Sequence, residues 1–394
     1  LYPRNEPTME WDIAAGHSIL KAAGGNIFSE SGMQIQYGKK KFKNKNFLAV
    51  GKTTHRLPSF FLMGLDKLNQ VKYKQDLNLA VKAIKDKKLV VFPTETVYGI
   101  GAIGNSEIAI NAIYSAKQRP YNNPLIAHTY NKNEAEKIVV FTKVAHLLTD
   151  QFWPGPLTII LQVKKTNLSN ILSQSSQTLA VRVPSHPVAL DLLEKVNTPI
   201  LAPSANKSGG VSPTSANHAR NDFGPHYKGK GWELETILDY GACEVGIEST
   251  VVDCRGKNPV ILRHGAITET MIFNATNTKA LTLNKTQELI SPGLLKSHYA
   301  PNAQVLLNQK KSITDSGWLT FGKIPKSLQN QKNMFNLSSD GNLIQAGALL
   351  YSGLRFLDSS GVKVIQVMTI PKVGIGIAIN DRLTRASFKE ESNI

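Results

Sequence analysis

The chain has little cysteine, a shortage of acidic residues and no long apolar run. Only Cys243 and Cys254 occur in 394 residues, too few for a disulfide framework or a zinc ribbon. We expect both to be reduced and buried, as in a cytosolic, cytoplasmic protein. No stretch of about 18 apolar residues occurs, so no membrane span is predicted. Hydrophobic residues make up 41% of the chain, and its length allows two or three globular domains.

Basic residues outnumber acidic ones by 46 to 29, which gives a formal net charge of +17. Such an excess is typical of proteins with an anionic partner such as RNA or a nucleotide. Residues 1–75 hold twelve Lys or Arg against five Asp or Glu, however. The lysines at 39–45 dominate that segment and equally fit a solvated loop, so the charge alone indicates little about function.

Residues 1–52 form a separate piece. The segment EWDIAAGHSILKAAGG predicts a short helix that stops at Gly24-Gly25. It resembles the C-terminal end of the inositol monophosphatase superfamily, especially the 3'(2'),5'-bisphosphate nucleotidases, and the resemblance implies that Asp12 helps to bind a metal. The other metal-binding carboxylates of that family are absent, and one carboxylate cannot hold a catalytic Mg²⁺ pair. We interpret the piece as an inactive phosphatase-like remnant, with Asp12 a vestigial candidate and no metal site predicted.

The rest of the chain predicts two α/β domains. Residues 53–72 read as a linker, after which Asp76 is expected to cap a helix. A mixed α/β domain is expected over 73–275, a polar linker over 276–303, and a smaller Rossmann-like domain over 304–394. In the larger domain, strands are predicted at 89–93, 124–130, 158–164, 179–184, 200–203, 249–254 and 260–264, and helices at 105–117, 134–152 and 186–196. The smaller domain has apolar runs QVLLN and GWLTFG, a helix near 342–357 and the strand VKVIQVM.

Two nucleotide-binding patterns in the sequence are weak. Gly99-x-Gly101-x-x-Gly104 matches the dinucleotide fingerprint, but the polar insert PTETVY separates it from the preceding strand, and no acid ends the next strand to bind a ribose. The segment from Asn46 to Thr53 is one residue short of a Walker A loop, and a lysine-rich stretch precedes it instead of a strand. We predict neither site.

Residues 89–128 are the most informative stretch. An apolar strand leads into a turn with two threonines and a glutamate, then three glycines, a helix ending in Lys117-Gln118-Arg119-Pro120, and a second strand. Strands, glycine-rich turns and nearby cations commonly hold phosphates. Here the cations lie at the far end of the helix, which argues against a P-loop.

Several motifs in one order give this stretch a family resemblance. PTETVYGIGA and SAKQRPYNNPLIAH are followed by FWPGPLTIIL, LAVRVPSHP, LAPSANKSGGVSPT, GIESTVVD and ILRHGAIT. Together they resemble the threonylcarbamoyl-AMP synthase, or YrdC-like, family over about residues 73–270. The linker SPGLLKSHYAP and the last domain resemble its long two-domain form. Gln118 stands where the family usually has glycine, a minor departure.

The resemblance implies a twisted mixed sheet with helices and a nucleotidyltransferase activity. L-threonine, bicarbonate or CO₂, and ATP would give threonylcarbamoyl-AMP and pyrophosphate, with Mg²⁺ arriving on ATP as substrate. The product would serve tRNA modification to threonylcarbamoyladenosine next to the anticodon, through a partner transferase complex.

The resemblance also implies site residues. Lys117 and Arg119 would offset charge on the triphosphate as catalytic residues. The residues implied for L-threonine are Thr94, His128, Thr178, Arg182 and Ser249, of which Arg182 suits a carboxylate through two parallel hydrogen bonds. The residues implied for ATP are Lys117, Asn123, Ala202, Ser204, Asn206, Ser212, Arg263, His298 and Tyr299, the last two closing over the site from the linker.

Each of these residues, taken singly, also fits an ordinary structural role, such as a solvated lysine, a turn-capping serine or a core histidine. Two other functions also stay open: an RNA-binding module without catalysis, and phosphatase activity from residues 1–52. A carbamoyl transferase of hydrogenase maturation shares the fold, but it needs cysteine-rich zinc motifs that two cysteines cannot form.

Overall fold

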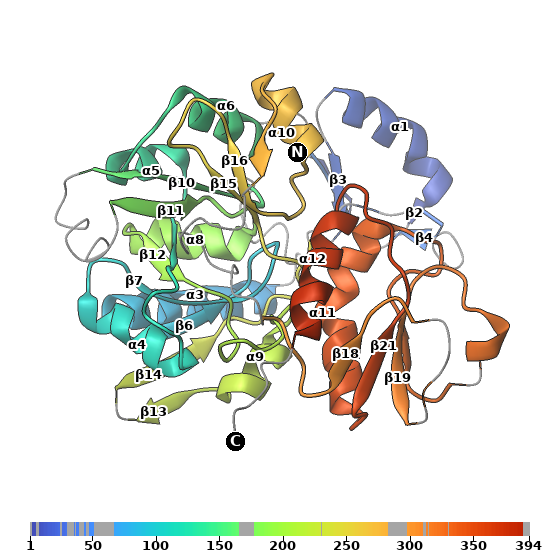
Figure 1. The fold of residues 1–394 in the computed structure, drawn as a ribbon. Coiled ribbons are helices and arrows are strands. Elements are labelled where there is room, and N and C mark those ends of the chain that lie inside the picture. Colours follow the sequence, from blue (N-terminus) through green and yellow to red (C-terminus); the bar gives the residue numbers. More distant parts are fainter. Residues whose placement is uncertain are drawn as a thin grey trace. The chain divides into compact units, whose positions relative to one another are not determined.

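The computed structural model describes most of the chain in two units, Leu1–Leu79 and Ala80–Ile394 (Figure 1). The described residues are 2–4, 8–23, 26–29, 35, 37–38, 43–44, 47–50, 67–164, 177–229, 231–282, 298–309, 313, 315–329 and 331–388.

Among its described residues, the first unit contains helix α1, two small sheets and the first part of helix α3 (Lys67–Lys85). Its elements are β1 (Tyr2–Arg4), β2 (Thr8–Met9), α1 (Glu10–Ala22), β3 (Asn26–Ser29), β4 (Lys43–Asn44) and β5 (Phe47–Val50). Strands pair in the order β1-β5-β3 and β2-β4. The predicted helix is confirmed as α1. Asp12 lies in its first turn, where its Oδ2 accepts a hydrogen bond of 2.7 Å from the backbone N–H of Met9, as expected of a carboxylate that caps a helix.

The predicted start of the next helix is wrong. Helix α3 runs from Lys67 to Lys85, so it begins inside the predicted linker, and Asp76 lies within it instead of capping it. The remainder of that linker, 51–66, lies outside the described residues. A run of helix formers such as Lys, Leu and Gln precedes Asp76 and extends the helix toward its N-terminus.

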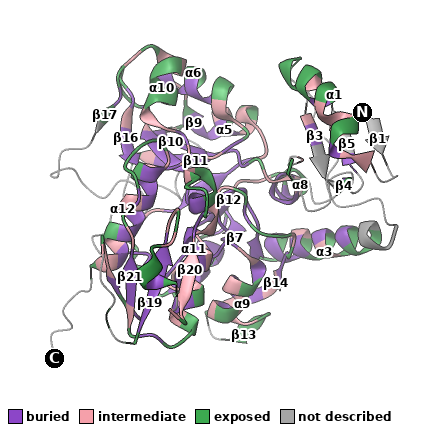
Figure 2. Ribbon diagram, turned by 90° about the vertical axis from the view of Figure 1, so that its right-hand side faces the viewer, coloured by how far each residue is buried: buried purple, intermediate pink, exposed green. Residues whose placement is uncertain are grey.

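Most of the second unit is built on one mixed sheet. Within the described residues it has twelve strands, in the order β13-β14-β6-β7-β12-β8-β11-β10-β15-β16-β17, with β9 beside β10. The bounds are β6 Leu89–Phe92, β7 Gly99–Ile103, β8 Ile126–His128, β9 Val139–Val140, β10 Leu157–Val163, β11 Thr178–Arg182, β12 Ile200–Ala202, β13 Tyr227–Gly229, β14 Trp232–Ile237, β15 Thr250–Asp253, β16 Val260–Arg263 and β17 Leu281–Thr282. The central strands are buried apolar runs, seen in purple in Figure 2, which explains why the sequence revealed them.

Helices lie between these strands in the sequence, and two of them, α5 and α6, occupy the range that was predicted as one helix. Their bounds are α4 Glu107–Lys117, α5 Lys132–Ile138, α6 Lys143–Phe152, α8 Pro187–Val196, α9 Ala216–Phe223 and α10 Glu269–Thr276. The single helix predicted over 134–152 is wrong, because Val139 and Val140 pair with β10 and Thr142 caps α6. Two β-branched residues followed by a capping threonine favour this break.

The glycines of the apparent dinucleotide fingerprint lie in strand β7 and just after it. A Cβ on Gly101 would lie 2.6 Å from Ile200 and 2.7 Å from Phe92, so this strand needs glycine to pack closely against its neighbours. The sequence reading of a glycine-rich turn was therefore wrong here. Strand β7, helix α9 and the β13–β14 hairpin were not predicted.

The C-terminal part forms the smaller α/β domain that was predicted. Four parallel strands pair in the order β18-β21-β19-β20. The elements are β18 Gln304–Leu306, β19 Ser316–Thr320, the 3₁₀ turn Lys326–Leu328, β20 Met334–Asn336, α11 Leu343–Ser359, β21 Val364–Val367 and α12 Gly376–Ser387. Helix α12 and strand β20 were not predicted. Cys243 and Cys254 are free and buried, as expected.

The smaller domain packs directly on the larger one through helix α11. Its apolar core includes Val97, Val211 and Ile247 of the larger domain. Gly246 has a φ of +69°, and a Cβ there would lie 2.4 Å from the backbone Cα of Ala348 in α11. The absence of a side chain at Gly246 therefore sets how closely the helix approaches.

Replacing Gly246 by alanine should lower the stability of the docked protein. A left-handed alanine costs about 1–2 kcal/mol, and the collision with backbone adds about 1–3 kcal/mol. Gly241→Ala is the matched control, because Gly241 has a φ of +90° and nothing within 4 Å of its Cβ position. Thermal unfolding of both variants checks this; equal shifts in the apparent Tm would show that the close approach of α11 is unimportant.

Candidate active site

A tight turn after β6 brings two threonines into the site. Thr94 Oγ1 donates to the carbonyl of Val97 at 2.6 Å and accepts the backbone N–H groups of Thr96 and Val97, each at 3.2 Å. The Thr94 and Thr96 hydroxyls are 2.9 Å apart. Threonine hydroxyls that bond nearby backbone favour turns over strands. The turn therefore positions both hydroxyls rigidly.

Arg182, at the end of β11, is held by this turn. Its Nη1 donates to Thr96 Oγ1 at 2.9 Å, its Nε to the carbonyl of Gly155 at 3.3 Å, and its Nη2 lies 2.7 Å from Oε1 of Glu95. Glu95 Oε2 in turn accepts the N–H of Ser185 at 3.1 Å. A guanidinium has five N–H groups, so three contacts fix its plane and leave two for a ligand.

Neighbouring strand ends supply the next polar groups. His128 ends β8 directly beside Arg182 in the sheet register, and burial, with the nearby Arg182, lowers its pKa to about 3, so the ring is neutral. Ser249 precedes β15, and its hydroxyl lies 2.7 Å from that of Thr158. Arg263, at the end of β16, donates to both the carbonyl and the hydroxyl of Ser249 at 3.1 Å.

Lys117 holds a loop instead of lining the cavity. Its side chain is 1% exposed, and its amine donates to the carbonyl of Ser204 at 2.6 Å and to that of Asn206. Burial, followed by repulsion from Arg119, lowers the pKa of Lys117 well below its usual value. The last residue of α4 thus fixes the segment that carries the SAN motif.

Arg119 follows Lys117 through a left-handed residue. Gln118 has a φ of +53° and caps α4, a conformation that glycine adopts at lower cost; this explains why glycine suits the position. Arg119 donates to the carbonyl and side-chain oxygens of Asn123 and to the carbonyl of Pro124 at 2.6–3.0 Å. Burial lowers its pKa to about 10, so it stays charged at neutral pH.

Glu248 contributes a buried negative charge to the cavity wall. Its Oε1 accepts a hydrogen bond from Ser212 at 2.5 Å, and its Oε2 accepts from Tyr351 at 2.7 Å and from Arg382 Nε at 3.0 Å. Burial disfavours the charge, but Arg382, Arg263 and the two hydroxyl donors outweigh it and lower the pKa of Glu248 to about 2. The carboxylate is therefore ionised.

His298 and Tyr299 line the cavity from the segment that precedes β18. The Nδ1 of His298 is buried without a hydrogen-bond partner in the described part of the chain. Burial, with Arg119, Lys117 and Arg263 nearby, lowers the pKa of His298 to about 3. Tyr299 has a φ of +63°, and such strained residues cluster at functional sites.

These groups surround one cavity of about 550 Å³, its open mouth included. Ten of the residues predicted from the sequence line it: Thr94, Arg119, His128, Arg182, Ala202, Ser204, Ser249, Arg263, His298 and Tyr299. Lys117, Asn123, Asn206 and Ser212 lie one step behind, where they contact lining residues or their loop. Thr178 is at the first position of β11, opposite Gln162 and four residues before Arg182, so the structure does not bring it to the cavity wall.

Sequence reasoning missed Glu95, Glu248 and Arg382. An acid in an otherwise apolar or hydroxyl-rich motif, as in PTETVY and GIEST, was the available signal for the two glutamates. Arg382 offered no local signal, because its partner lies 134 positions away.

Within the described residues no group of three His, Cys, Asp or Glu side chains is arranged to hold a metal ion. None of the helices in the described ranges combines the length and apolar character that crossing a membrane requires.

Two family models match adjoining parts of the chain. One, described as telomere recombination, matches residues 82–265, and one described as the threonylcarbamoyl-AMP synthase C-terminal domain matches residues 266–387. A curated threonylcarbamoyl-AMP synthase of Pyrococcus abyssi is 35% identical over 333 residues, covering 79% of this chain and 94% of the relative. The chain belongs to the threonylcarbamoyl-AMP synthase family.

Further relatives agree with this family. The threonylcarbamoyl-AMP synthase of Bacillus subtilis is 35% identical over 325 residues, covering 78% of this chain and 92% of the relative. The crystal structure of P. abyssi Sua5 complexed with L-threonine matches with a TM-score of 0.70 at 32% identity, over 79% of this chain and 94% of that one. The predicted α/β fold, the family and the nucleotidyltransferase-like enzyme class are thus confirmed.

The lowered pKa of Glu248 predicts how the stability of the protein depends on pH. Its pKa is about 2 in the folded protein against an ordinary 4.5, so its contribution to stability is present above pH 4.5 and is lost as the pH falls toward 2. Between pH 5 and 3 this loss should be on the order of 2 kcal/mol. Glu248→Gln should lack it and show a flatter decline in urea stability over that range. Parallel declines for variant and wild type would contradict the assignment.

Proposed function

We propose that the protein is an L-threonylcarbamoyladenylate synthase. The carboxylated amine of L-threonine, formed with bicarbonate or CO₂, attacks the α-phosphorus of ATP through a carbamate oxygen. A P–O bond forms there, the bond between the α-phosphorus and the bridging oxygen breaks, and pyrophosphate leaves. The product is threonylcarbamoyl-AMP.

One observation carries the proposal: three arginines, Arg119, Arg182 and Arg263, are buried around a single cavity. Buried cations are costly unless anions compensate them. Arg119 directs its donors to uncharged oxygens within the described residues. A cavity of this charge favours a ligand with several negative groups, and a triphosphate together with a carboxylated amino acid meets that need.

Arg182 marks the end of the cavity that suits threonine. Its remaining N–H groups can take the amino-acid carboxylate. The Thr94, Thr96 and Ser249 hydroxyls and the neutral His128 are hydrogen-bonding groups for the amine and the side-chain hydroxyl. The P. abyssi relative, solved with L-threonine and similar over 79% of this chain, supports this substrate.

Arg119, Arg263 and the SAN segment suit the nucleotide. Arg119 and Arg263 offset the charge that develops on the phosphates. Lys117 acts by holding the carbonyls of Ser204 and Asn206, so that this segment presents a fixed surface to ATP. His298 lines the same cavity, and its Nδ1 has no hydrogen-bond partner among the described residues and is available to the nucleotide. The His298–Tyr299 segment excludes water from the labile anhydride.

Mg²⁺ is proposed to accompany ATP, bound by phosphate oxygens. Glu248, which lines the cavity, is paired with Arg382, and Glu95, between the two site threonines in the chain, is paired with Arg182. This protein donor set does not fit a dedicated metal cage. The proposed downstream partners are a threonylcarbamoyl transferase complex and tRNA, whose adenosine next to the anticodon receives the group. A cytoplasmic location follows from that role.

Incubation with ATP, Mg²⁺, L-threonine and bicarbonate should release pyrophosphate, and mass spectrometry should detect the mixed anhydride of AMP and carboxylated threonine. Lys117→Ala should lower the rate by about 10²–10³-fold, because the SAN segment loses its anchor. Lys132→Ala is the matched control, since Lys132 pairs with Asp150 at the surface, and it should keep full activity. Wild-type protein that binds tRNA but gives no anhydride would instead favour the RNA-binding alternative.

Residues 1–52 are proposed to be a remnant without a part in this reaction. Deleting residues 1–66, up to the start of α3, should leave the synthase rate within twofold, because the cavity residues all lie beyond residue 90. The full-length protein should show no Mg²⁺-dependent release of phosphate from 3'(2'),5'-bisphosphate nucleotides. Such a release that disappears on deletion would show that the phosphatase-like unit is active.

A further inference from the structure

The smaller domain reaches the wall of the active-site cavity through one carboxylate. Both donors to Glu248 Oε2, Tyr351 of α11 and Arg382 of α12, come from that domain, whereas Ser212, the donor to Oε1, belongs to the larger one. Glu248 itself lines the cavity and immediately precedes Ser249. The carboxylate is thus shared between a cavity wall and a domain interface.

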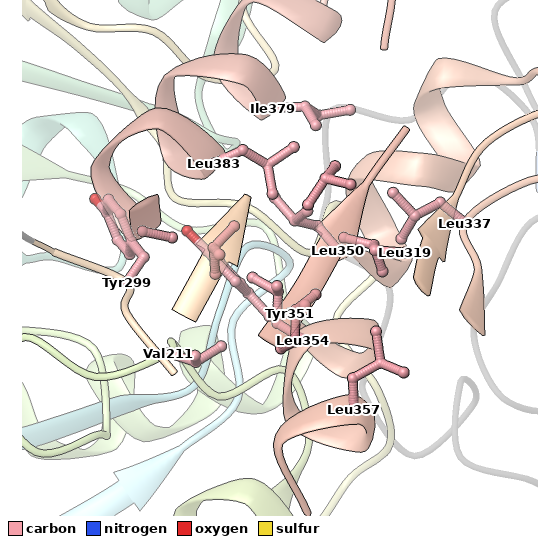
Figure 3. Close-up of a cluster of buried hydrophobic side chains, with 14 of the residues drawn as sticks. Val211, Tyr299, Leu319, Leu337, Leu350, Tyr351, Leu354, Leu357, Ile379 and Leu383 are labelled. Atoms are coloured by element: carbon pink, nitrogen blue, oxygen red, sulfur yellow. The ribbon is translucent and has the colours of Figure 1, made fainter. Parts of the chain in front are cut away.

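Arg382 is committed to this contact. Its side chain is fully buried, and its Nη1 pairs with Asp381 at 2.8 Å. Its guanidinium also lies 5.3 Å from the ring of Tyr299, which is cation–π range. Tyr299 in turn stacks on Tyr351 with ring centroids 5.7 Å apart. Figure 3 shows the two rings side by side within the apolar core of the smaller domain.

An anionic side chain in the wall of a triphosphate site needs an explanation. Left uncompensated, ionised Glu248 would repel the phosphates. It would also offset the positive charge of Arg263, which already helps to lower the pKa of Glu248. Arg382 removes both problems because it supplies a cation from behind the wall, outside the set of residues that line the cavity. Tyr351 holds the same oxygen, which keeps the carboxylate directed toward the smaller domain.

We propose that Arg382 and Tyr351 are positioning residues for the nucleotide. They neutralise and orient Glu248, and through Tyr299 they hold the left-handed turn that covers the cavity. The smaller domain is therefore part of the nucleotide site without touching the reacting atoms. This inference rests on the proposed synthase function.

A double-mutant cycle tests the charge argument. Arg382→Gln should raise the Kd for a non-hydrolysable ATP analogue, and the KM for ATP, at least tenfold, with the KM for threonine changed less than threefold. Adding Glu248→Gln to this variant removes the uncompensated charge and should restore nucleotide affinity to within about threefold of wild type. Arg385→Gln is the matched control: it removes the same charge one turn further along α12, from a side chain paired with Asp381, and should leave both constants within twofold.

Two further measurements separate the outcomes. Thermal unfolding identifies a variant that fails to fold; if Arg382→Gln does, Tyr351→Phe, which keeps the ring and removes one donor to Glu248, should raise the same Kd about threefold to fivefold. A folded Arg382→Gln with unchanged nucleotide affinity overturns the inference, and so does a double variant that shows no recovery. Wild-type protein that makes no threonylcarbamoyl-AMP overturns the proposed function instead, and the binding constants still decide the role of Arg382.

Discussion

Compensation of buried charge is the constraint on which the site depends. Arginines come from the ends of separate strands and from the residues after helix α4, and they converge on one cavity. Desolvating so many cations is tolerated only where partners offset the cost. Glu95 pairs with Arg182 and Glu248 with Arg382, while Arg119 relies on the uncharged oxygens of Asn123 and Pro124. The cavity wall remains cationic, which is the property that an anionic substrate needs.

The sheet supplies the rigidity that this arrangement requires. His128 and Arg182 are direct neighbours in parallel strands, so their relative position is fixed by backbone hydrogen bonds. Gly101 lets β7 pack closely against Phe92 and Ile200. Side chains that emerge from such strand ends lose little further freedom when a ligand binds, which favours catalysis by preorganisation.

Local signals made much of this predictable. Apolar runs predicted the central strands, and the helix predicted over 105–117 is α4, Glu107–Lys117. The ordered motifs brought together ten residues that do line one cavity. The misses were non-local. Val139 and Val140 form a strand only because β10 is beside them, and β7 is a strand because its glycines fit against β12. The pairing of Glu248 with Arg382 spans 134 positions and two domains, so no window of sequence contains it.

Lys117 has a different role from the one that its position in the sequence suggested. Its place at the end of α4 suggested direct contact with phosphate, yet the amine donates to the carbonyls of Ser204 and Asn206 and does not line the cavity. Lys117 and Arg382 then act alike. Lys117 holds the loop of Ser204 and Asn206, and Arg382 holds Glu248 from the smaller domain, so each fixes part of the cavity wall without lining the cavity. Because Glu248 joins the wall to the smaller domain, the free energy of docking that domain and the free energy of binding at the cavity are linked. By reciprocity, a nucleotide that binds best to the compensated wall must also strengthen the docking of α11 and α12.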